Sequence, residues 1–238
     1  MVSCFSQTNQ DSSTGTLLIR FRIFGSVCCL SHQETLTFWH RLLIRRGVGL
    51  LFRGGFNPRP RLSLPLPRAV GLQSDADLLA AEVESLTAAG DLNQLSMRLN
   101  GMLPEGMEVL EISGIEGKVQ LRPVSTVYRW TRHPESSAEK WLSELQRCRE
   151  QIKTDQSILL ERNHPKKGKK TMDLREYIQS LDGTGEYIQV QCRVTPYGTL
   201  RIDELTEWFG LTSADLAEPV RRLSVQWKRN IKGEEEQV

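Results

Sequence analysis

The sequence predicts a mixed α+β fold of two tandem ferredoxin-like units, with antiparallel sheets that carry their helices on one face. Segments with alternating apolar residues, typical of half-buried strands, lie between segments whose apolar residues recur every three or four positions, as in helices. In the first half these segments follow the order strand, helix, strand, strand, helix, strand, which is that of a split βαβ unit. The second half has a looser version of the same order.

The two units are expected over residues 16–117 and 118–231 and are joined near Gly117. A disordered tail is expected over residues 1–15 and an acidic tail over residues 232–238, because both are polar and lack apolar periodicity. The alternative is a single domain in which one sheet extends through both halves.

The opening strand is expected over residues 17–24, where apolar residues alternate with two arginines. A helix follows over residues 33–46, because its apolar residues recur at helical spacing until Gly47 and Gly49 break it. A short apolar strand is then expected over residues 48–52.

Four prolines within residues 54–67 cannot occupy the centre of a sheet, so this segment is expected to be a loop at a sheet edge or over a surface. A strand over residues 78–85 follows. Asp91 is then the expected N-cap of a helix whose apolar residues line one face as far as Leu103. A strand over residues 107–115 ends the unit.

The second unit is expected to begin with an alternating strand over residues 124–130. Ser136 and Glu139 have the spacing of a capping box, which predicts a helix after them. The apolar residues that this helix would turn inward are Trp141, Leu145, Cys148 and Ile152. The remaining expected elements are strands over 157–160, 187–194 and 223–227 and a helix over 202–209.

The composition argues against several classes of protein. No apolar stretch approaches the roughly 20 residues needed to cross a bilayer. The first 13 residues lack the basic start and apolar core of a secretion signal, so a cytoplasmic protein is expected. The five cysteines are odd in number and show no C-x-x-C spacing, so neither a structural zinc nor a cysteine-held iron–sulfur cluster is expected.

Positive charge is concentrated in one segment. The net charge of the chain is +2, but residues 35–74 contain seven arginines and neither aspartate nor glutamate. This segment alone carries +7, so the rest of the chain sums to −5. Such a concentration creates a local potential that attracts anions.

Residues 54–60, with the sequence GGFNPRP, form the first candidate site. Glycines such as Gly55 allow the backbone to approach a ligand closely, and the prolines reduce the entropy lost when the loop is ordered. Arg59 could then bind a phosphate or carboxylate with two guanidinium nitrogens. The alternative is a structural turn in which Phe56 packs into the core and Asn57 hydrogen-bonds the backbone.

The helix over residues 33–46 is the second candidate. Arg41 and Arg45 are four residues apart and share a helix face without an acidic neighbour, which favours an anionic partner. His32 is a candidate general base, but a histidine near a helix start is more often a cap or a packed polar group. The other ligand candidates in and before the basic segment are Ser31, Arg46, Arg53 and Arg61.

A lysine cluster that includes Lys166 and Lys167 is the third candidate, because lysines can bind a nucleic-acid backbone by releasing its counterions. The alternative is an ordinary solvated loop. The sequence contains no Walker loop, nucleophile elbow or H-E-x-x-H motif.

Short motifs are spread over nearly the whole chain from about residue 17. The most specific is the GGFNPRP loop, and it is preceded by Ser31-His32 and by the Arg45-Arg46 pair. The weaker motifs are LSLPLP at 62–67, Gly71-x-x-Ser74, Leu103-Pro-Glu-Gly106, Asp173-Leu-Arg175, Gly198-Thr-Leu-Arg201 and Arg221-Arg222. Together they resemble the radical-SAM-linked family of unknown function. The chain departs from that family's pattern after His32, where Gln33-Glu34 replaces a Leu-Asp pair.

Members of the radical-SAM-linked family are encoded beside, or fused to, radical S-adenosylmethionine (radical SAM) proteins, often of the cobalamin-binding kind. The resemblance therefore implies a radical SAM partner. That partner would carry S-adenosylmethionine, the iron–sulfur cluster and, in the cobalamin-binding kind, cobalamin, while this chain would bind no cofactor or metal. The chain would recognise or present the substrate.

Three functions remain open. The leading hypothesis is an accessory, non-catalytic protein that binds RNA for the radical SAM partner, with transfer or ribosomal RNA as the candidate substrate; ferredoxin-like units often bind RNA. The second is an enzyme that uses His32 and Arg59 on a phosphorylated or nucleotide substrate. The third is a protein–protein adaptor whose arginines contact an acidic surface of the radical SAM partner.

Overall fold

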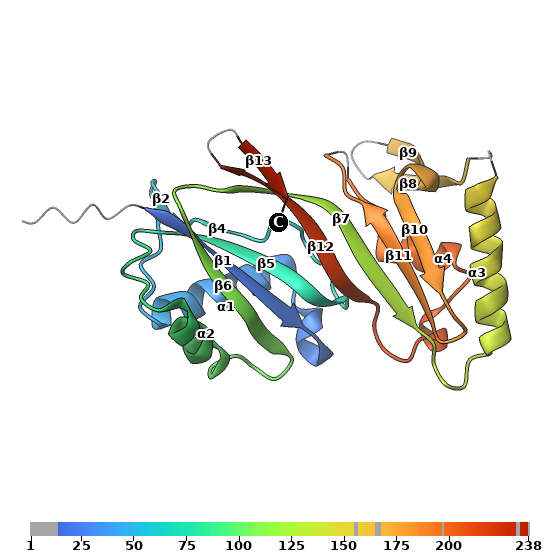
Figure 1. The fold of residues 1–238 in the computed structure, drawn as a ribbon, viewed down its shortest axis with the longest axis horizontal. Coiled ribbons are helices and arrows are strands. Elements are labelled where there is room, and N and C mark those ends of the chain that lie inside the picture. The colour runs from blue at the N-terminus through green and yellow to red at the C-terminus, as the bar shows by residue number, and fades with distance from the viewer. Residues whose placement is uncertain (1–13, 155–156, 165–167, 197, 232–233, 238) are drawn as a thin grey trace, which may run out of the picture.

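The computed structural model describes residues 14–154, 157–164, 168–196, 198–231 and 234–237. Over these residues the chain forms a large, mostly antiparallel sheet, two small two-stranded ladders and four α-helices (Figure 1). The mixed α+β class predicted from the sequence is therefore confirmed. No helix in this part of the chain combines the length and apolar character needed to span a bilayer.

The elements divide at the turn between β6 and β7. Those before it are β1 (Gly15–Ile23), the 3₁₀ helix η1 (Gly25–Cys29), α1 (His32–Arg45), β2 (Phe52–Arg53), β3 (Arg59–Pro60), β4 (Leu62–Ser63), β5 (Gln73–Val83), α2 (Leu92–Asn100) and β6 (Met107–Glu116). Those after it are β7 (Gln120–Thr131), α3 (Ala138–Lys153), β8 (Leu159–His164), β9 (Gly168–Asp173), η2 (Leu174–Glu176), β10 (Ile178–Gly183), β11 (Tyr187–Arg193), α4 (Ile202–Trp208), η3 (Ser213–Asp215), β12 (Arg221–Ile231) and β13 (Glu234–Gln237).

The large sheet runs through both halves of the molecule. Within the described residues its strand order is β10-β11-β7-β12-β5-β1-β6, with β4 paired to β5 and β13 paired to β12. Neighbouring long strands are antiparallel, but β12 pairs with β5 in a short parallel ladder that aligns Arg221 with Gln73 and Arg222 with Ser74. This ladder joins the two halves.

The same strand arrangement occurs in each half. In the first half β1 lies between β6 and β5, and β4 lies beyond β5. In the second half β7 lies between β12 and β11, and β10 lies beyond β11. Along the chain each set of four strands reads strand, helix, strand, strand, helix, strand. Each half adds one hairpin to this order, β2–β3 between α1 and β4 and β8–β9 between α3 and β10.

Each half has its own apolar core beneath its helices. α1 and α2 pack on β1, β5 and β6 around the fully buried Trp39 and Leu99. α3 and α4 pack on β7 and β11 around Trp130 and Trp141, which are also fully buried. On the other face of β1 and β5, Trp227 of β12 packs with Leu18, Leu78 and Ala80. Apolar packing thus occupies both faces of the first-half sheet.

Most of the predicted elements are confirmed, with shifts at their ends. The opening strand, the three longest helices, β6, β7, β11, α4 and β12 all lie where their periodicity predicts. β5 begins at Gln73, five residues before its expected start, and β8 begins two residues late. β9 and β10 were not predicted, and β13 lies within the segment expected to be an acidic tail.

Two local predictions are wrong. The strand expected over 48–52 is reduced to an isolated bridge between Leu50 and Val83, because the chain leaves β5 at Phe52 to pair with β3 in the hairpin. Ser136 is not the N-cap of α3. Ser137 caps this helix, whereas the Ser136 hydroxyl lies 3.0 Å from the Asp215 carboxylate.

A buried ionic cluster lies where the two halves meet. Arg68, Asp77 and Arg222 are each less than a tenth exposed. Arg222 donates through Nη2 to Asp77 Oδ1, and through Nε to the Ser74 hydroxyl at 3.2 Å. Arg68 Nε lies 3.4 Å from Asp77 Oδ2. One carboxylate therefore binds two guanidinium groups, one from the loop before β5 and one from β12.

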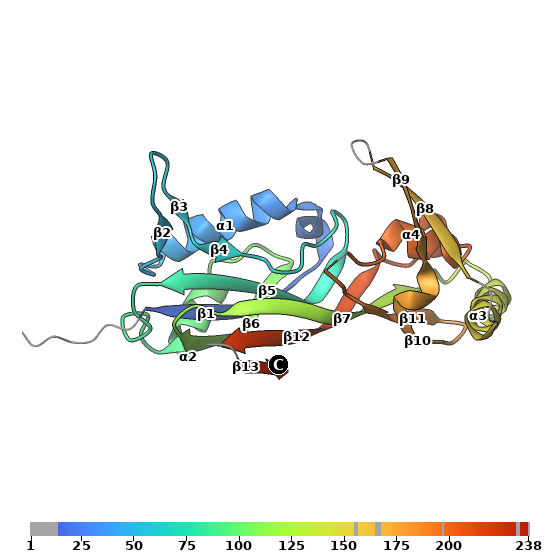
Figure 2. The same cartoon turned by 90° about the horizontal axis from the view of Figure 1, so that it is seen from above.

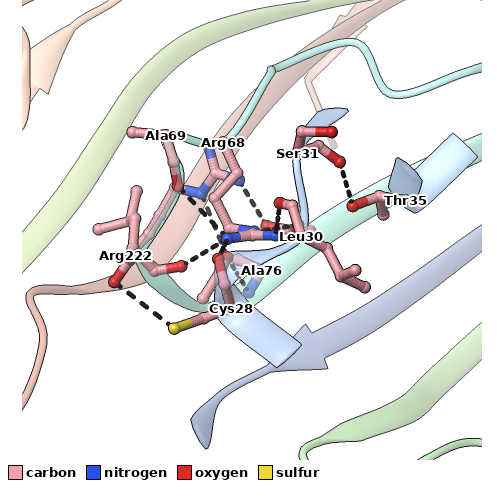
Figure 3. Close-up of polar contacts among 12 residues, drawn as sticks. Cys28, Leu30, Ser31, Thr35, Arg68, Ala69, Ala76 and Arg222 are labelled. Carbon is pink, nitrogen blue, oxygen red and sulfur yellow. Dashed lines mark hydrogen bonds and ion pairs between the residues drawn. The ribbon is translucent and has the colours of Figure 1, made fainter. Parts of the chain in front are cut away.

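Arg68 also fixes the turn that leads into α1 (Figure 3). Its Nη1 donates to the carbonyls of Cys28 and, at 2.9 Å, Leu72, and its Nη2 donates to the Leu30 carbonyl at 3.1 Å. Burial lowers the pKa of Arg68, and the adjacent Asp77 carboxylate opposes that shift. The start of α1 is thereby tied to the junction of the two halves.

We expect Asp77→Asn to lower the free energy of unfolding by about 3–5 kcal/mol, because it leaves two buried guanidinium groups without a carboxylate. Urea unfolding of the purified protein measures this loss. The control is Glu111→Gln, whose pair with Arg20 is more than half exposed on both sides and should contribute less than about 1 kcal/mol. Equal losses in the two variants would show that the buried cluster does not stabilise the fold.

Candidate functional site

A hollow lies between α1 and the β2–β3 hairpin, and we call it the hairpin hollow. It has a volume of about 630 Å³. Arg53 and Arg59 of the hairpin line one side, and Gln33, Thr37 and His40 of α1 line the other. None of its lining residues is acidic, so it presents positive potential to any ligand that enters.

A second hollow of about 380 Å³, the helix hollow, lies farther round α1. Arg41 and Arg45 line it, together with Met102 beyond α2. Glu34 lines it too, so the expectation that these two arginines have no acidic neighbour is wrong. Gln33 and Thr37 line both hollows, so the two adjoin along the same exposed side of α1.

The arginines of these hollows pair with no carboxylate within the described residues. Glu34 lines the helix hollow, but its carboxylate accepts from the Ser31 backbone nitrogen. Arg41, Arg45, Arg53 and Arg59 are exposed, and in the described part of the chain none forms an ion pair or a side-chain hydrogen bond. We call these four residues the arginine surface. Because four cations on adjoining hollows repel one another, an anionic ligand that bound among them would relieve that repulsion.

The other three arginines of the basic segment have different surroundings. Arg61 pairs with Glu82 at 2.9 Å, and Arg68 is buried against Asp77. Arg46 is half-buried at the end of α1 and lines neither hollow; within the described residues its Nε has no hydrogen-bond partner. The seven arginines therefore do not all gather on one surface.

Ser31 caps α1. Its hydroxyl accepts from the Glu34 backbone nitrogen at 3.3 Å, and the Glu34 carboxylate accepts from the Ser31 backbone nitrogen at 2.8 Å. These hydrogen bonds lower the pKa of Glu34. Ser31 and Glu34 therefore form a capping box at the start of α1. His32 opens the helix but lines neither hollow.

The GGFNPRP loop forms the tip of the β2–β3 hairpin, which stands away from the sheet (Figure 2). Gly55 has a φ of +132°, which a residue with a side chain rarely adopts. Phe56 is fully exposed, so the alternative in which it packs into the core is wrong. Asn57 is also exposed. Gly55, Phe56 and Asn57 lie beyond the hairpin hollow.

Sequence reasoning missed three polar residues of α1 that line the hairpin hollow. Gln33, Thr37 and His40 follow the spacing i, i+4, i+7, which places them on one helix face. The sequence signal for this face is the polar spacing itself, outside the apolar stripe of the predicted helix. Lys166 and Lys167 lie outside the described residues.

Other features of the molecule are less suited to an anionic ligand. A cleft of about 990 Å³ at the junction of the halves is lined by Arg201, Asp203 and Glu207, so its charges are mixed. Among the described residues no group of three His, Cys, Asp or Glu side chains is placed to bind a metal ion. Burial raises the pKa of Cys148 and of Cys192 to about 12, which keeps both thiols protonated at neutral pH.

We expect Ser31→Ala to lower the free energy of unfolding by about 1 kcal/mol, because it removes the N-cap of α1. Its retention on a heparin column at neutral pH should equal that of the wild type, since Ser31 is a cap and not a ligand. Ser143→Ala on the exposed side of α3 is the control for stability. Weaker heparin retention with unchanged stability would make Ser31 part of the binding surface instead.

Comparison with known proteins places the chain in a family. Residues 16–203 match the family described as an uncharacterized protein conserved in bacteria (DUF2344). The match runs from β1 to the start of α4 and includes the whole arginine surface. No curated protein is similar enough to the chain to count as a match. The chain therefore belongs to the DUF2344 family of uncharacterized bacterial proteins.

Proposed function

We propose that this protein binds RNA through the arginine surface and acts as an accessory substrate-recognition protein for a radical SAM enzyme in the cytoplasm. The observation that carries the proposal is the set of four exposed arginines without carboxylate partners among the described residues, which frame two adjoining hollows. A solvated surface normally mixes charges of both signs, whereas polyanion-binding surfaces concentrate one sign.

Guanidinium groups suit phosphates because they donate two parallel hydrogen bonds to a pair of oxygens. The arginine surface presents two such groups from α1 and two from the β2–β3 hairpin, around two adjoining hollows. RNA supplies a row of phosphates, and binding it releases condensed counterions. A small phosphorylated ligand would use one hollow and leave the other arginines unpaired.

The fold supports the same proposal. The strand arrangement shared by the two halves is that of two ferredoxin-like units, which we propose as the architecture, and RNA-recognition modules are often built on this topology. This is an argument from fold and is weaker than the argument from the surface.

The proposed radical SAM partner comes from the motifs that resemble the radical-SAM-linked family. The GGFNPRP motif, which is the most specific of them, forms the hairpin that contributes Arg53 and Arg59 to the arginine surface. The partner would carry S-adenosylmethionine, the iron–sulfur cluster and, in the cobalamin-binding kind, cobalamin. This chain would hold a transfer or ribosomal RNA substrate for it.

The other two functions have less support. An enzyme that combines His32 with Arg59 would need both at one site, but Arg59 lines the hairpin hollow and His32 does not. An adaptor would use the arginines on an acidic protein surface. That function gives the two hollows no role.

We expect Arg41→Ala combined with Arg45→Ala to weaken binding of single-stranded RNA by about tenfold or more at 0.1 M salt, because two phosphate contacts and their released counterions are lost. The slope of log affinity against log salt concentration should fall in magnitude by about 1.4. Arg53→Ala combined with Arg59→Ala should lower the affinity and the slope by similar amounts. Filter binding or fluorescence anisotropy measures both quantities.

The matched control for these variants is Arg20→Ala combined with Arg149→Ala, which removes the same charge from exposed arginines that already have carboxylate partners. This variant should keep most of the affinity and the slope. The RNA-binding proposal is wrong if the wild type binds no RNA at low salt, or if the control loses as much affinity as the two test variants.

A second experiment addresses the partner. We expect a radical SAM protein encoded beside this chain to copurify with it, and we expect nuclease treatment to release the RNA that they share. Copurification that persists after nuclease treatment and is lost in the Arg41→Ala plus Arg45→Ala variant would favour the adaptor function instead.

A further inference from the structure

The β2–β3 hairpin combines an exposed aromatic ring with a pair of facing arginines. Phe56 is fully exposed at the turn. Arg53 and Arg59 face each other across the two strands as register partners. In the sequence Phe56 is three residues from each arginine, so the hairpin places one aromatic ring beyond a pair of cations.

The facing arginines point to an external anion. Like charges directly opposite each other on paired strands are destabilising. Neither Arg53 nor Arg59 has a carboxylate partner within the described residues, and both line the hairpin hollow. The two arginines are therefore positioned to bind an anionic group of a ligand in the hairpin hollow.

The exposed ring points to a flat apolar group beside that anion. Single exposed apolar residues are common and need no explanation by themselves. Phe56 differs because it lies in the turn between two facing arginines, and the fixed φ of Pro58 constrains that turn. A constrained turn loses little entropy when the ring is covered, which favours binding.

We infer that Phe56 is a stacking platform for an unpaired nucleobase, and that Arg53 and Arg59 bind the phosphates that flank this base. This inference rests on the proposed RNA-binding function and names its substrate class as single-stranded RNA or an RNA loop. A double helix covers the faces of its bases, whereas single-stranded segments expose them to aromatic side chains.

Two other ligands fit the hairpin less well. Inorganic phosphate or a small phosphorylated molecule would satisfy the arginines but leave the ring in water. An acidic protein surface would satisfy the arginines too, but it would need a separate apolar pocket beside its carboxylates to cover Phe56. A nucleotide chain supplies the anions and the flat ring in one repeating unit, and the hairpin hollow gives its backbone a path toward α1.

The test compares variants of Phe56 in their binding to a single-stranded RNA, to a fully paired RNA hairpin and to an abasic oligonucleotide of equal length. We expect Phe56→Ala to weaken single-strand binding by about 5- to 100-fold without changing the salt slope, because a base stack is lost but no phosphate contact is. Phe56→Trp should retain the affinity. Phe56→Leu should lose it, because leucine keeps the apolar contact but has no aromatic face.

The abasic oligonucleotide gives a sharper comparison. It retains phosphates but has no bases, so the wild type and Phe56→Ala should bind it equally. Leu142→Ala, which truncates a half-exposed apolar residue on the distant α3, is the control for general effects of removing surface area. It should leave binding to all three oligonucleotides unchanged.

The outcomes separate this inference from the proposed function. If RNA binds with a strong salt dependence and the arginine variants weaken it, but Phe56→Ala and Leu142→Ala behave alike, the stacking inference is overturned and the RNA-binding function stands. Full affinity in Phe56→Leu, or equal effects of Phe56→Ala on paired and unpaired RNA, also overturns stacking. If no oligonucleotide binds even at low salt, the proposed function fails.

Discussion

The structure depends on the sharing of one buried carboxylate by two buried guanidinium groups. Asp77 binds Arg222 from the last long strand of the second half and Arg68 from the loop before β5. Removing a charged partner from such a cluster is far more costly than removing an exposed one, because the remaining charge cannot regain its water. The cluster therefore couples the parallel pairing of β12 with β5 to the position of the loop, and Arg68 extends that coupling through backbone carbonyls to the start of α1.

Because Arg68 fixes the start of α1, the two sides of this helix have fixed surroundings. One side carries Trp39 and Leu43 into the first-half core. The other side carries Arg41, Arg45 and His40 along the two hollows. The capping box at Ser31 satisfies the first turn of the helix, so its N-terminus needs no ligand for stability. The arginine surface is thus held by a rigid helix and by a hairpin whose turn is constrained.

The sequence allowed the periodic elements to be predicted, because alternation in β1 and β11 and helical spacing in α1 and α3 are local properties. The concentration of arginine within residues 35–74 also predicted a basic surface. It could not show that Arg68 and Arg61 turn away from that surface, because their partners, Asp77 and Glu82, lie on β5 and meet them only through tertiary pairing. The burial of Arg222 depends in the same way on the junction of the halves. For the same reason His40 was missed, since a hollow exists only where two elements are placed side by side.

The central claim is that RNA follows the arginine surface along α1 and the β2–β3 hairpin. Ultraviolet cross-linking of the protein to a single-stranded RNA, followed by mass spectrometry of the cross-linked peptides, tests it most directly. We expect the cross-links to fall within residues 33–45 and 52–60. Cross-links confined to the second half, or to the cleft at the junction that Arg201 and Asp203 line, would contradict it.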